Sequence, residues 1–330
     1  MKPSVPHAPY PRLVGDIGGT NARFGWISEA PAEGAEPLIT DVHTLPTADH
    51  AQLADAVRAY LSRIGRGQPG SMAFGIANPI TGDEVRMTNH HWSFSLSGLQ
   101  SELGLKRLVV INDFTALALA LPSLKAHEIR QLGGGTARPD APIALLGAGT
   151  GLGVSGLIHS AAGWTALAGE GGHVTLAATD DREAAVLEHM RRVFGHVSAE
   201  RALSGSGLVN LYNAVSQLHA SAPLPLSPAD VTQKALDGSD AACVEAVEHF
   251  CAFLGNVAGN LALSLGSLGG VYLGGGIVPR LGAFFDRSKF RQRFESKGRF
   301  ESYLAAIPVF VIDASVSPAL AGAARALGED

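Results

Sequence analysis

One pattern occurs twice in the chain: a short apolar strand, a glycine-rich turn and a second strand. The first copy spans residues 13–27 and the second spans residues 143–159. Two strands joined by a tight turn of this kind predict a β-hairpin whose backbone N–H groups can converge on an anion. A hairpin of this type in each half of a 330-residue chain predicts a duplicated α/β domain, with both hairpins contacting one nucleotide.

The first turn reads Gly-Asp-Ile-Gly-Gly-Thr-Asn-Ala-Arg over residues 15–23. We expect Asp16 to face a cation held by the bound anion. The turn is not a Walker loop, because no Gly-Lys-Ser/Thr follows, and its glycine spacing does not fit a dinucleotide fingerprint. An ordinary glycine-rich hairpin is the alternative, and the Asp, Thr, Asn and Arg beside the glycine pair weaken it.

A strand followed at once by a helix is predicted in the middle of the first half. Residues 109–111 are β-branched, which favours a strand, and residues 115–121 are rich in Ala and Leu, which favours a helix. Asn112 and Asp113 therefore lie at the carboxyl end of a strand, the edge at which ligands bind in open α/β sheets. Asp113 is either a helix cap or a base, and the remaining motifs of the chain favour the base.

Further elements are predicted from hydrophobic periodicity. We expect strands at residues 38–44, 71–76, 85–88, 271–273 and 309–312, and helices at residues 51–64, 182–194, 207–218, 227–236, 239–265 and 319–327. Residues 89–94 are expected to form a polar aromatic loop. The Gly-Thr-Pro segment at residues 133–142 is interpreted as a crossing between two domains.

Composition excludes several classes of protein. Charged residues make up 17% of the chain, hydrophobic residues 46%, and the net charge is −5, which indicates a soluble α/β enzyme without the basic patch of a nucleic-acid-binding protein. Cys243 and Cys251 are eight positions apart on a predicted helix, about 12 Å along its axis, too far for a disulfide. Reduced cysteines, and an N-terminus without the apolar core of a signal peptide, favour a cytoplasmic protein.

One long stretch imitates a membrane span. Residues 250–279 contain no Asp, Glu, Lys or Arg, and that length could cross a bilayer. Asn256, Asn260 and the glycine clusters argue against a spanning helix. We expect a buried helix that ends near Gly266, followed by a strand and the glycine loop at residues 274–276, and hence no membrane partner.

Three acidic or imidazole side chains lie in the second half near glycine-rich turns. Glu170 and His173 are spaced i, i+3, as a metal pair on a helix would be. The two intervening glycines favour instead a loop that presents two hydrogen-bonding side chains. Ser198 is too close to Glu200 for a capping box, so a site role for Glu200 is favoured.

Taken together, these segments closely resemble the bacterial glucokinases of the proteobacterial type, which are ATP:D-glucose 6-phosphotransferases. The matching segments occur in family order, and the resemblance extends over nearly all of the chain: residues 15–23, 78–83, 87–90, 111–114, 147–153, 169–173, 198–201 and 274–280. The resemblance implies the two-domain α/β fold of the actin/hexokinase-like (ribonuclease H-like) class around a central cleft. It also implies a homodimer, with a small domain of residues 1–122 plus 314–330 and a large domain of residues 123–313.

The resemblance also implies the site residues. Asp113 matches the catalytic base, and the glucose ligands correspond to Asn112, Asp113, Glu170, His173 and Glu200. ATP is expected to be bound by Gly15, Asp16, Ile17, Gly18, Gly19, Thr20, Asn21, Gly149, Thr150, Gly151, Gly275 and Gly276. Asp16 is expected to orient Mg²⁺ through water. The implied reaction is phosphorylation of D-glucose at O6, the first step of glycolysis.

Two alternatives to this function differ in class. Sugar kinases of the ROK type usually carry several closely spaced cysteines near the sugar-binding His, whereas this chain has no cysteine before Cys243. A non-catalytic sugar sensor would need a DNA-binding module, and the dozen residues before the first predicted strand are too few for a helix-turn-helix.

Overall fold

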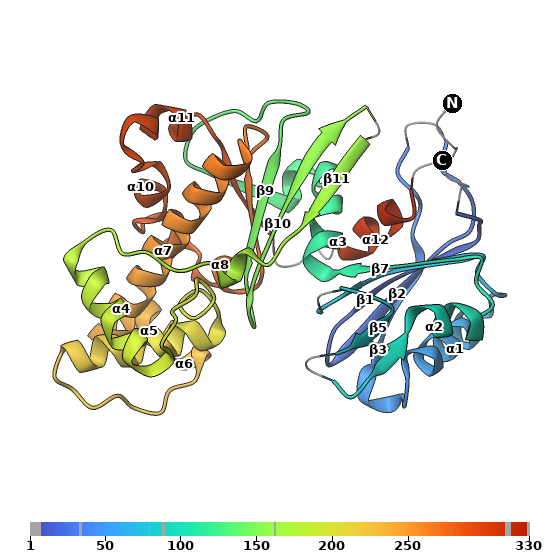
Figure 1. Ribbon diagram of the computed structural model, residues 1–330, viewed down its shortest axis with the longest axis horizontal. Helices are drawn as coiled ribbons and strands as arrows, with labels where there is room; N and C mark the ends of the chain where they lie inside the picture. The colour runs from blue at the N-terminus through green and yellow to red at the C-terminus, as the bar shows by residue number, and fades with distance from the viewer. Residues whose placement is uncertain are drawn as a thin grey trace. The chain divides into compact units, whose positions relative to one another are not determined.

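The computed structural model describes residues 8–32, 35–78, 80–87, 90–161, 163–313 and 318–328. The chain divides into two compact units, one of Met1–Leu124 with Ser317–Asp330 and the other of Lys125–Val316. Each unit is a mixed α/β structure with its own sheet (Figure 1).

The first unit is built on a five-stranded sheet of order β3-β2-β1-β4-β7. Its strands are β1 (Arg12–Ile17), β2 (Asn21–Ile27), β3 (Thr40–Pro46), β4 (Ser71–Ile76) and β7 (Arg107–Asn112). β1, β4 and β7 run parallel to one another, whereas β2 is antiparallel to both of its neighbours. Leu13 faces helix α1 (Leu53–Ile64), and Val14 faces α12 (Ala319–Ala326), as the period of two along a strand requires.

The remaining elements of the first unit are short. They are the hairpin β5 (Glu84–Arg86) and β6 (Ser93–Ser95), the helices α2 (Leu96–Glu102) and α3 (Asp113–Ala120), and the 3₁₀ turns η1 (Thr47–Asp49) and η2 (Leu121–Ser123). The prediction of a loop at residues 89–94 is wrong for Ser93 and Phe94, which pair with β5. Thr88 and Asn89 lie outside the described residues. Helix α12, drawn in red beside α3 in Figure 1, returns the end of the chain to this unit.

The second unit has a six-stranded sheet of order β11-β10-β9-β12-β13-β8. Its strands are β8 (Ile129–Leu132), β9 (Ile143–Ala148), β10 (Leu152–Ser160), β11 (Gly163–Ala168), β12 (Val271–Gly274) and β13 (Val309–Ile312). Its helices are α4 (Asp181–Phe194), α5 (Gly205–Leu218), α6 (Pro228–Asp237), α7 (Ala241–Leu265), α8 (Ile277–Leu281), α9 (Ala283–Asp286), α10 (Phe290–Glu295) and α11 (Glu301–Ala305), with 3₁₀ turns η3 (Ala126–Glu128), η4 (Gly171–His173) and η5 (Gly298–Phe300).

The two sheets repeat the same five-strand arrangement. In each, a hairpin of antiparallel strands is followed on one side by two parallel strands: β1 by β4 and β7, and β9 by β12 and β13. On the other side of each hairpin lies one further antiparallel strand. The duplication predicted from the two glycine-rich turns is thus confirmed.

The segment at residues 133–142 does not cross between units. It lies inside the second unit and joins β8 to β9 of one sheet, so the interpretation as an inter-domain crossing is wrong. Two of the three glycines at its start, Gly133 and Gly135, are closely packed. A Cβ on Gly133 would lie 2.6 Å from Arg291 Nε, and one on Gly135 would lie 2.5 Å from the Ala306 carbonyl oxygen.

Helix α7 is the apolar stretch that imitates a membrane span. Within the described part of the chain it is the one helix long and apolar enough to qualify, and 78% of its apolar window is buried inside the protein. The helix ends at Gly266, which has a φ of 63°, as predicted, and Asp240 caps its first turn. Cys243 and Cys251 on this helix are buried and free, so α7 is a core helix with reduced thiols.

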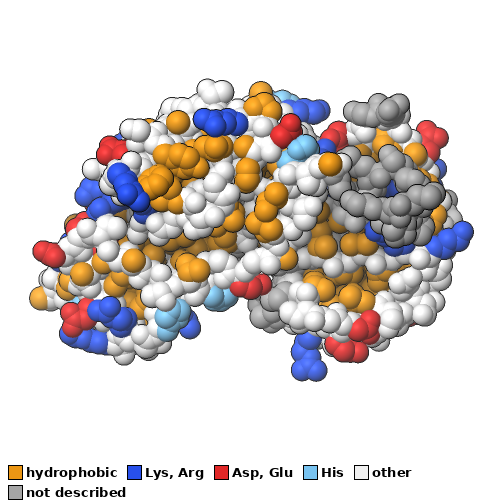
Figure 2. Space-filling model, turned by 45° about the horizontal axis from the view of Figure 1, so that its top comes forward, with side chains coloured by type: hydrophobic (Ala, Val, Ile, Leu, Met, Phe, Trp, Pro, Cys, Tyr) orange, Lys and Arg blue, Asp and Glu red, His pale blue; other side chains and the backbone are white. Residues whose placement is uncertain are grey.

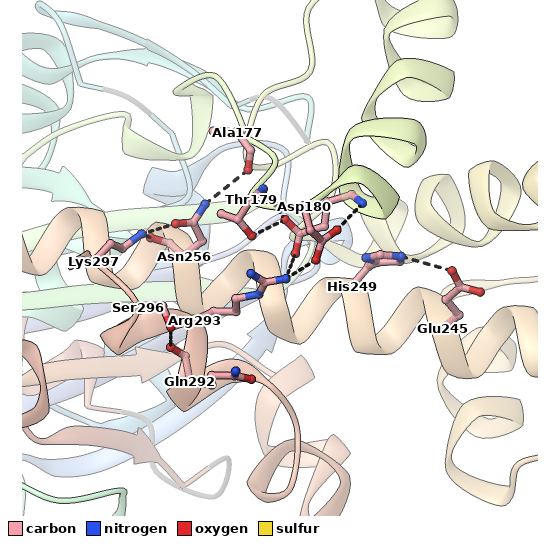
Figure 3. A network of polar contacts seen from close by, with 11 residues as sticks. Ala177, Thr179, Asp180, Glu245, His249, Asn256, Gln292, Arg293, Ser296 and Lys297 are labelled. Carbon is pink, nitrogen blue, oxygen red and sulfur yellow. Dashed lines mark hydrogen bonds and ion pairs between the residues drawn. The ribbon is translucent and has the colours of Figure 1, made fainter. Parts of the chain in front are cut away.

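A polar network joins the start of α4 to α10 in the second unit (Figure 3). The Glu183 carboxylate is 2% exposed and accepts hydrogen bonds of 2.7 Å from both N–H and O–H of Thr179. The Arg293 guanidinium lies 3.0 Å from Glu183 and also pairs with Asp180. These contacts balance the charge of a carboxylate that is almost fully buried.

On the face of the molecule drawn in Figure 2, Lys and Arg side chains alternate with Asp and Glu side chains over the described residues. A continuous basic stripe, the usual footprint of a nucleic-acid-binding surface, is not seen on this face.

Candidate active site

The carboxyl ends of three parallel strands define a candidate site in the first unit. Ile17 of β1 is in register with Ile76 of β4, and Ile76 is in register with Asn112 of β7. Asp16 and Asp113 adjoin these positions, so the structure brings together the side chains that the sequence placed at this edge. Gly75 lies between them, and its missing side chain makes room for α3, because a Cβ there would lie 3.0 Å from Ala116 Cβ.

Asn112, and not Asp113, caps helix α3. Its side-chain oxygen accepts hydrogen bonds from the backbone N–H of Phe114 (2.9 Å) and Thr115 (3.3 Å), and its Nδ2 donates to the Asn78 carbonyl (3.5 Å). Asp113 is the first residue of the helix. The alternative that Asp113 serves as the cap is therefore wrong, and its carboxylate is left at the strand edge.

Asp113 has the electrostatic surroundings of a base. The pKa of its carboxyl is raised to about 6: burial is the largest cause, a hydrogen bond from the Phe114 N–H opposes the shift, and the charge of Asp16 adds to it. Burial also raises the pKa of Asp16, which is opposed by the charge of Arg23 on the neighbouring strand. A carboxyl group whose pKa lies just below neutrality can take a proton at physiological pH.

The turn between β1 and β2 is fixed by a residue that sequence reasoning missed. Thr47 is fully buried; its hydroxyl donates to the Gly19 carbonyl (2.8 Å) and its N–H donates to the Thr20 carbonyl (3.0 Å). A further bond joins the Gly18 N–H to the Asn21 carbonyl (2.9 Å). No sequence signal marked Thr47, because the contact joins the end of β3 to a turn 27 residues earlier.

The matching turn of the second unit is held at both ends. The Gly149 N–H donates to the Gly151 carbonyl (2.9 Å), and the Gly205 N–H at the start of α5 donates to the Gly149 carbonyl (2.8 Å). The Leu152 N–H donates to Glu200 Oε2 at 2.9 Å. Glu200 therefore lies against the turn at residues 149–151.

Glu170 and His173 are exposed residues beside the segment that carries Glu200. Residues 171–173 form the 3₁₀ turn η4, so the prediction of a loop without helix is wrong for this single turn. The His173 N–H bonds to the Glu170 carbonyl (3.0 Å), and the Glu200 N–H bonds to the Gly172 carbonyl (2.9 Å). The structure thus gathers these three predicted sugar ligands in one cluster of the second unit, and Asn112 and Asp113 in the first.

A cavity of about 860 Å³ opens beside the second turn. Gly149, Thr150 and Gly276 line it, as do residues of α5, α6 and α8 that the sequence reasoning did not assign: Ser206, Pro228, Thr232, Gln233 and Arg280. Arg280 could have been found, since it ends the glycine motif at residues 274–280. Gly275 has a φ of +80°, and a Cβ on it would collide with the Ala148 backbone, so this glycine is required by packing against β9.

These features coincide with a known family. The sequence matches the family described as Glucokinase over residues 13–330. The chain belongs to the glucokinase family.

Relatives and solved structures agree with this membership. A protein named Glucokinase from Aromatoleum aromaticum is 57% identical over 319 residues, which cover 96% of this chain and 95% of the relative. One from Chromobacterium violaceum is 53% identical over 329 residues, covering 100% of this chain and 92% of the relative. The crystal structure of a glucokinase from an Antarctic psychrotroph is similar with a TM-score of 0.89 and 38% identity, covering 97% of this chain and 99% of that one. The predicted actin/hexokinase-like sugar kinase fold is confirmed.

Proposed function

We propose that this member of the glucokinase family is an ATP-dependent glucokinase. It transfers the γ-phosphoryl group of ATP to O6 of D-glucose, giving glucose 6-phosphate and ADP, the first step of glycolysis. Besides the family match, one observation carries the proposal: a buried carboxyl, Asp113, stands at the carboxyl edge of a parallel sheet with its pKa raised to about 6. Such a group suits the one proton transfer that phosphorylation of a hydroxyl requires.

The sugar is proposed to be bound by Asn112, Asp113, Glu170, His173 and Glu200. A sugar hydroxyl both donates and accepts, so carboxylates, an amide and an imidazole match it. Asn112 can offer only its Nδ2 group, because its oxygen caps α3. Asp113 accepts the proton of the 6-hydroxyl during transfer.

The two glycine-rich turns are proposed to hold the phosphates of ATP, with Gly15 to Asn21 on the first unit and Gly149, Thr150 and Gly151 on the second. The cavity lined by Gly276 and Arg280 has a volume typical of small-ligand sites and is proposed to take the adenosine, together with Gly275. Mg²⁺ is proposed as the second cofactor. Carboxylate oxygens are its preferred protein ligands, and Asp16 would orient it through water, where it would neutralise charge on the phosphates.

The remaining proposals concern the whole protein. We propose two domains, residues 1–122 plus 314–330 and residues 123–313, in a cytoplasmic homodimer that binds neither nucleic acid nor membranes. The last described helix, α12, packs on β1 and Ala73 of β4, which supports placing the C-terminal residues in the small domain.

A coupled assay for ADP formation on the purified protein tests the proposed function. We expect ADP to form only when glucose, ATP and Mg²⁺ are all present, to stop on addition of EDTA and to return with excess Mg²⁺. Binding of glucose without any ADP formation would show a sugar sensor instead of a kinase.

A further inference from the structure

The proposed sugar-binding and phosphate-binding segments of the second unit meet at one residue, Leu152. It directly follows the turn at residues 149–151 and is 5% exposed. Its N–H donates to Glu200 Oε2 at 2.9 Å, and its carbonyl lies so close to Gly172 that a Cβ there would collide with it. The backbone of the phosphate turn therefore ends on a carboxylate that is proposed to bind glucose.

The segment that begins at Glu200 holds both ends of this turn. The Glu200 carbonyl accepts a hydrogen bond from Ser204 Oγ at 2.8 Å, and the Gly205 N–H that follows donates to the Gly149 carbonyl at 2.8 Å. At the other end, the Glu200 carboxylate holds the Leu152 N–H. Glu200 and Gly205 are five positions apart, so one short segment contacts both ends of the turn.

Gly151 leaves the space that the Glu200 carboxylate occupies. A Cβ on Gly151 would lie 2.5 Å from Glu200 Oε2, whereas a Cβ on Gly149 would meet nothing within 4 Å. Both glycines have backbone conformations outside the left-handed region. The absence of a side chain at residue 151 is therefore explained by the carboxylate and not by backbone strain.

We propose that Glu200 is a positioning residue for the phosphate turn in addition to its proposed contact with glucose. One carboxylate oxygen holds the Leu152 N–H, and the other is left for a sugar hydroxyl. The inference rests on the proposed function, since it requires glucose at Glu200 and a nucleotide phosphate at the turn. Coupling between two binding sites is reciprocal, so glucose bound at Glu200 and a nucleotide bound at the turn should change each other's affinity by the same factor.

The first test measures glucose affinity by calorimetry without nucleotide. In Gly151→Ala the new Cβ clashes with the Glu200 carboxylate and displaces it from its position. Glucose should then lose one charged hydrogen bond and bind at least about tenfold more weakly than to the wild type. Gly149→Ala is the matched control on the same turn, and its glucose Kd should stay within about twofold of the wild type. Equal glucose affinity in both variants would overturn the inference.

The second test measures the affinity for the Mg²⁺ complex of AMPPNP, a non-hydrolysable ATP analogue, without glucose. Glu200→Ala leaves the buried Leu152 N–H without its acceptor, so the analogue should bind about five- to tenfold more weakly. Glu200→Gln keeps an acceptor oxygen, so its affinity for the analogue should stay within about twofold of the wild type. Glu170→Ala is the control, because it alters only an exposed side chain of the proposed sugar ligands. Its affinity for the analogue should also stay within about twofold of the wild type. Unchanged affinity in Glu200→Ala would contradict the inference.

Binding by the wild type distinguishes failure of the proposed function from failure of the positioning role. If it bound neither glucose nor the analogue, the proposed function would fail. If it bound both and the variants kept wild-type affinities at the opposite site, only the positioning role of Glu200 would fail. Thermal unfolding of each variant shows whether it is folded. If Glu200→Ala does not fold, the comparison of Gly151→Ala with Gly149→Ala still tests the inference.

Discussion

Asp113 is subject to two opposing demands. Burial favours its protonated form and raises its pKa to about 6, whereas a base must be ionised before it can accept a proton. The carboxylate is therefore available above this pH and lost below it.

The pH dependence of the reaction should show this titration. We expect kcat/KM for glucose to be level near pH 8 and to fall about tenfold per pH unit below an apparent pKa of about 6. The measurement is a steady-state profile between pH 5 and pH 9, after confirming that the enzyme stays folded throughout. A level profile down to pH 5 would contradict the assignment of the raised pKa to the catalytic group.

The same pKa makes a prediction about stability. A folded pKa raised above the unfolded value of 3.8 means that the folded state binds more protons, so stability contributed by this group is lost as the pH rises from 4 to above 6. Asp113→Asn should therefore be more stable than the wild type at pH 8, by about 1–3 kcal/mol. The gain should vanish near pH 3.5. Denaturant unfolding of both proteins at the two pH values measures it, and a loss of stability at pH 8 would refute the sign.

Sequence reasoning located this pair of residues but could not divide their roles. Asn and Asp are both favoured helix caps, so composition alone left Asp113 as either cap or base. The structure decides through the backbone: residue 112 has the extended φ of −62° and ψ of 147° of a cap, and the helix begins at Asp113. Thr47 was missed altogether, because its contacts with the first turn depend on tertiary packing.

Among the elements, a partly buried ion pair in the second unit joins α4 to α10. Arg293 on α10 is the cation that faces the buried carboxylate of Glu183 on α4, and Asp180 shares it. Removing one partner of a buried ion pair leaves an uncompensated charge.

Arg293→Met should destabilise the protein by about 3–5 kcal/mol, because Glu183 would remain buried without its cation. The double variant with Glu183→Gln should recover part of this loss, since the glutamine keeps a polar side chain but carries no charge. Arg192→Met is the control, because the Arg192 pair with Glu188 is exposed on both sides and should contribute less than about 1 kcal/mol. Equal effects of Arg293→Met and Arg192→Met in chemical denaturation would contradict the role of the network.

Elements with a clear hydrophobic period were predicted well, and the others were not. The hairpins, α1, α4, α7 and β13 lie where expected within a few residues. Helix α2 and the short helices α8 to α11 were missed, since four to seven residues give too little periodicity. The segment at residues 133–142 was misinterpreted because its glycines signal close packing against Arg291 and Ala306 as readily as they signal a linker.

At the scale of the whole molecule, the proposed ligands of one glucose belong to both units: Asn112 and Asp113 to one, and Glu170, His173 and Glu200 to the other. Binding of a ligand to residues of both units restricts their freedom relative to one another. The chain passes between the units at Leu124 and again between β13 and α12, so these connections, and not the segment at residues 133–142, are the candidate hinges.

We therefore expect the radius of gyration from small-angle scattering to be smaller at saturating glucose than without sugar. L-glucose, which presents the same groups in mirror image, is the control and should leave the scattering curve unchanged. Superimposable curves with and without D-glucose would show that the arrangement of the units is independent of the sugar.

The most direct test of the proposed mechanism is Asp113→Asn, measured for both turnover and glucose binding on the same preparation. The amide keeps the size of the side chain and can accept the hydrogen bond from the Phe114 N–H, but it cannot take the proton of the 6-hydroxyl. We expect a glucose Kd within about threefold of the wild type and a kcat lower by about 10²–10⁴-fold. A variant that lost glucose binding but kept its kcat would show that Asp113 binds the sugar and is not the base.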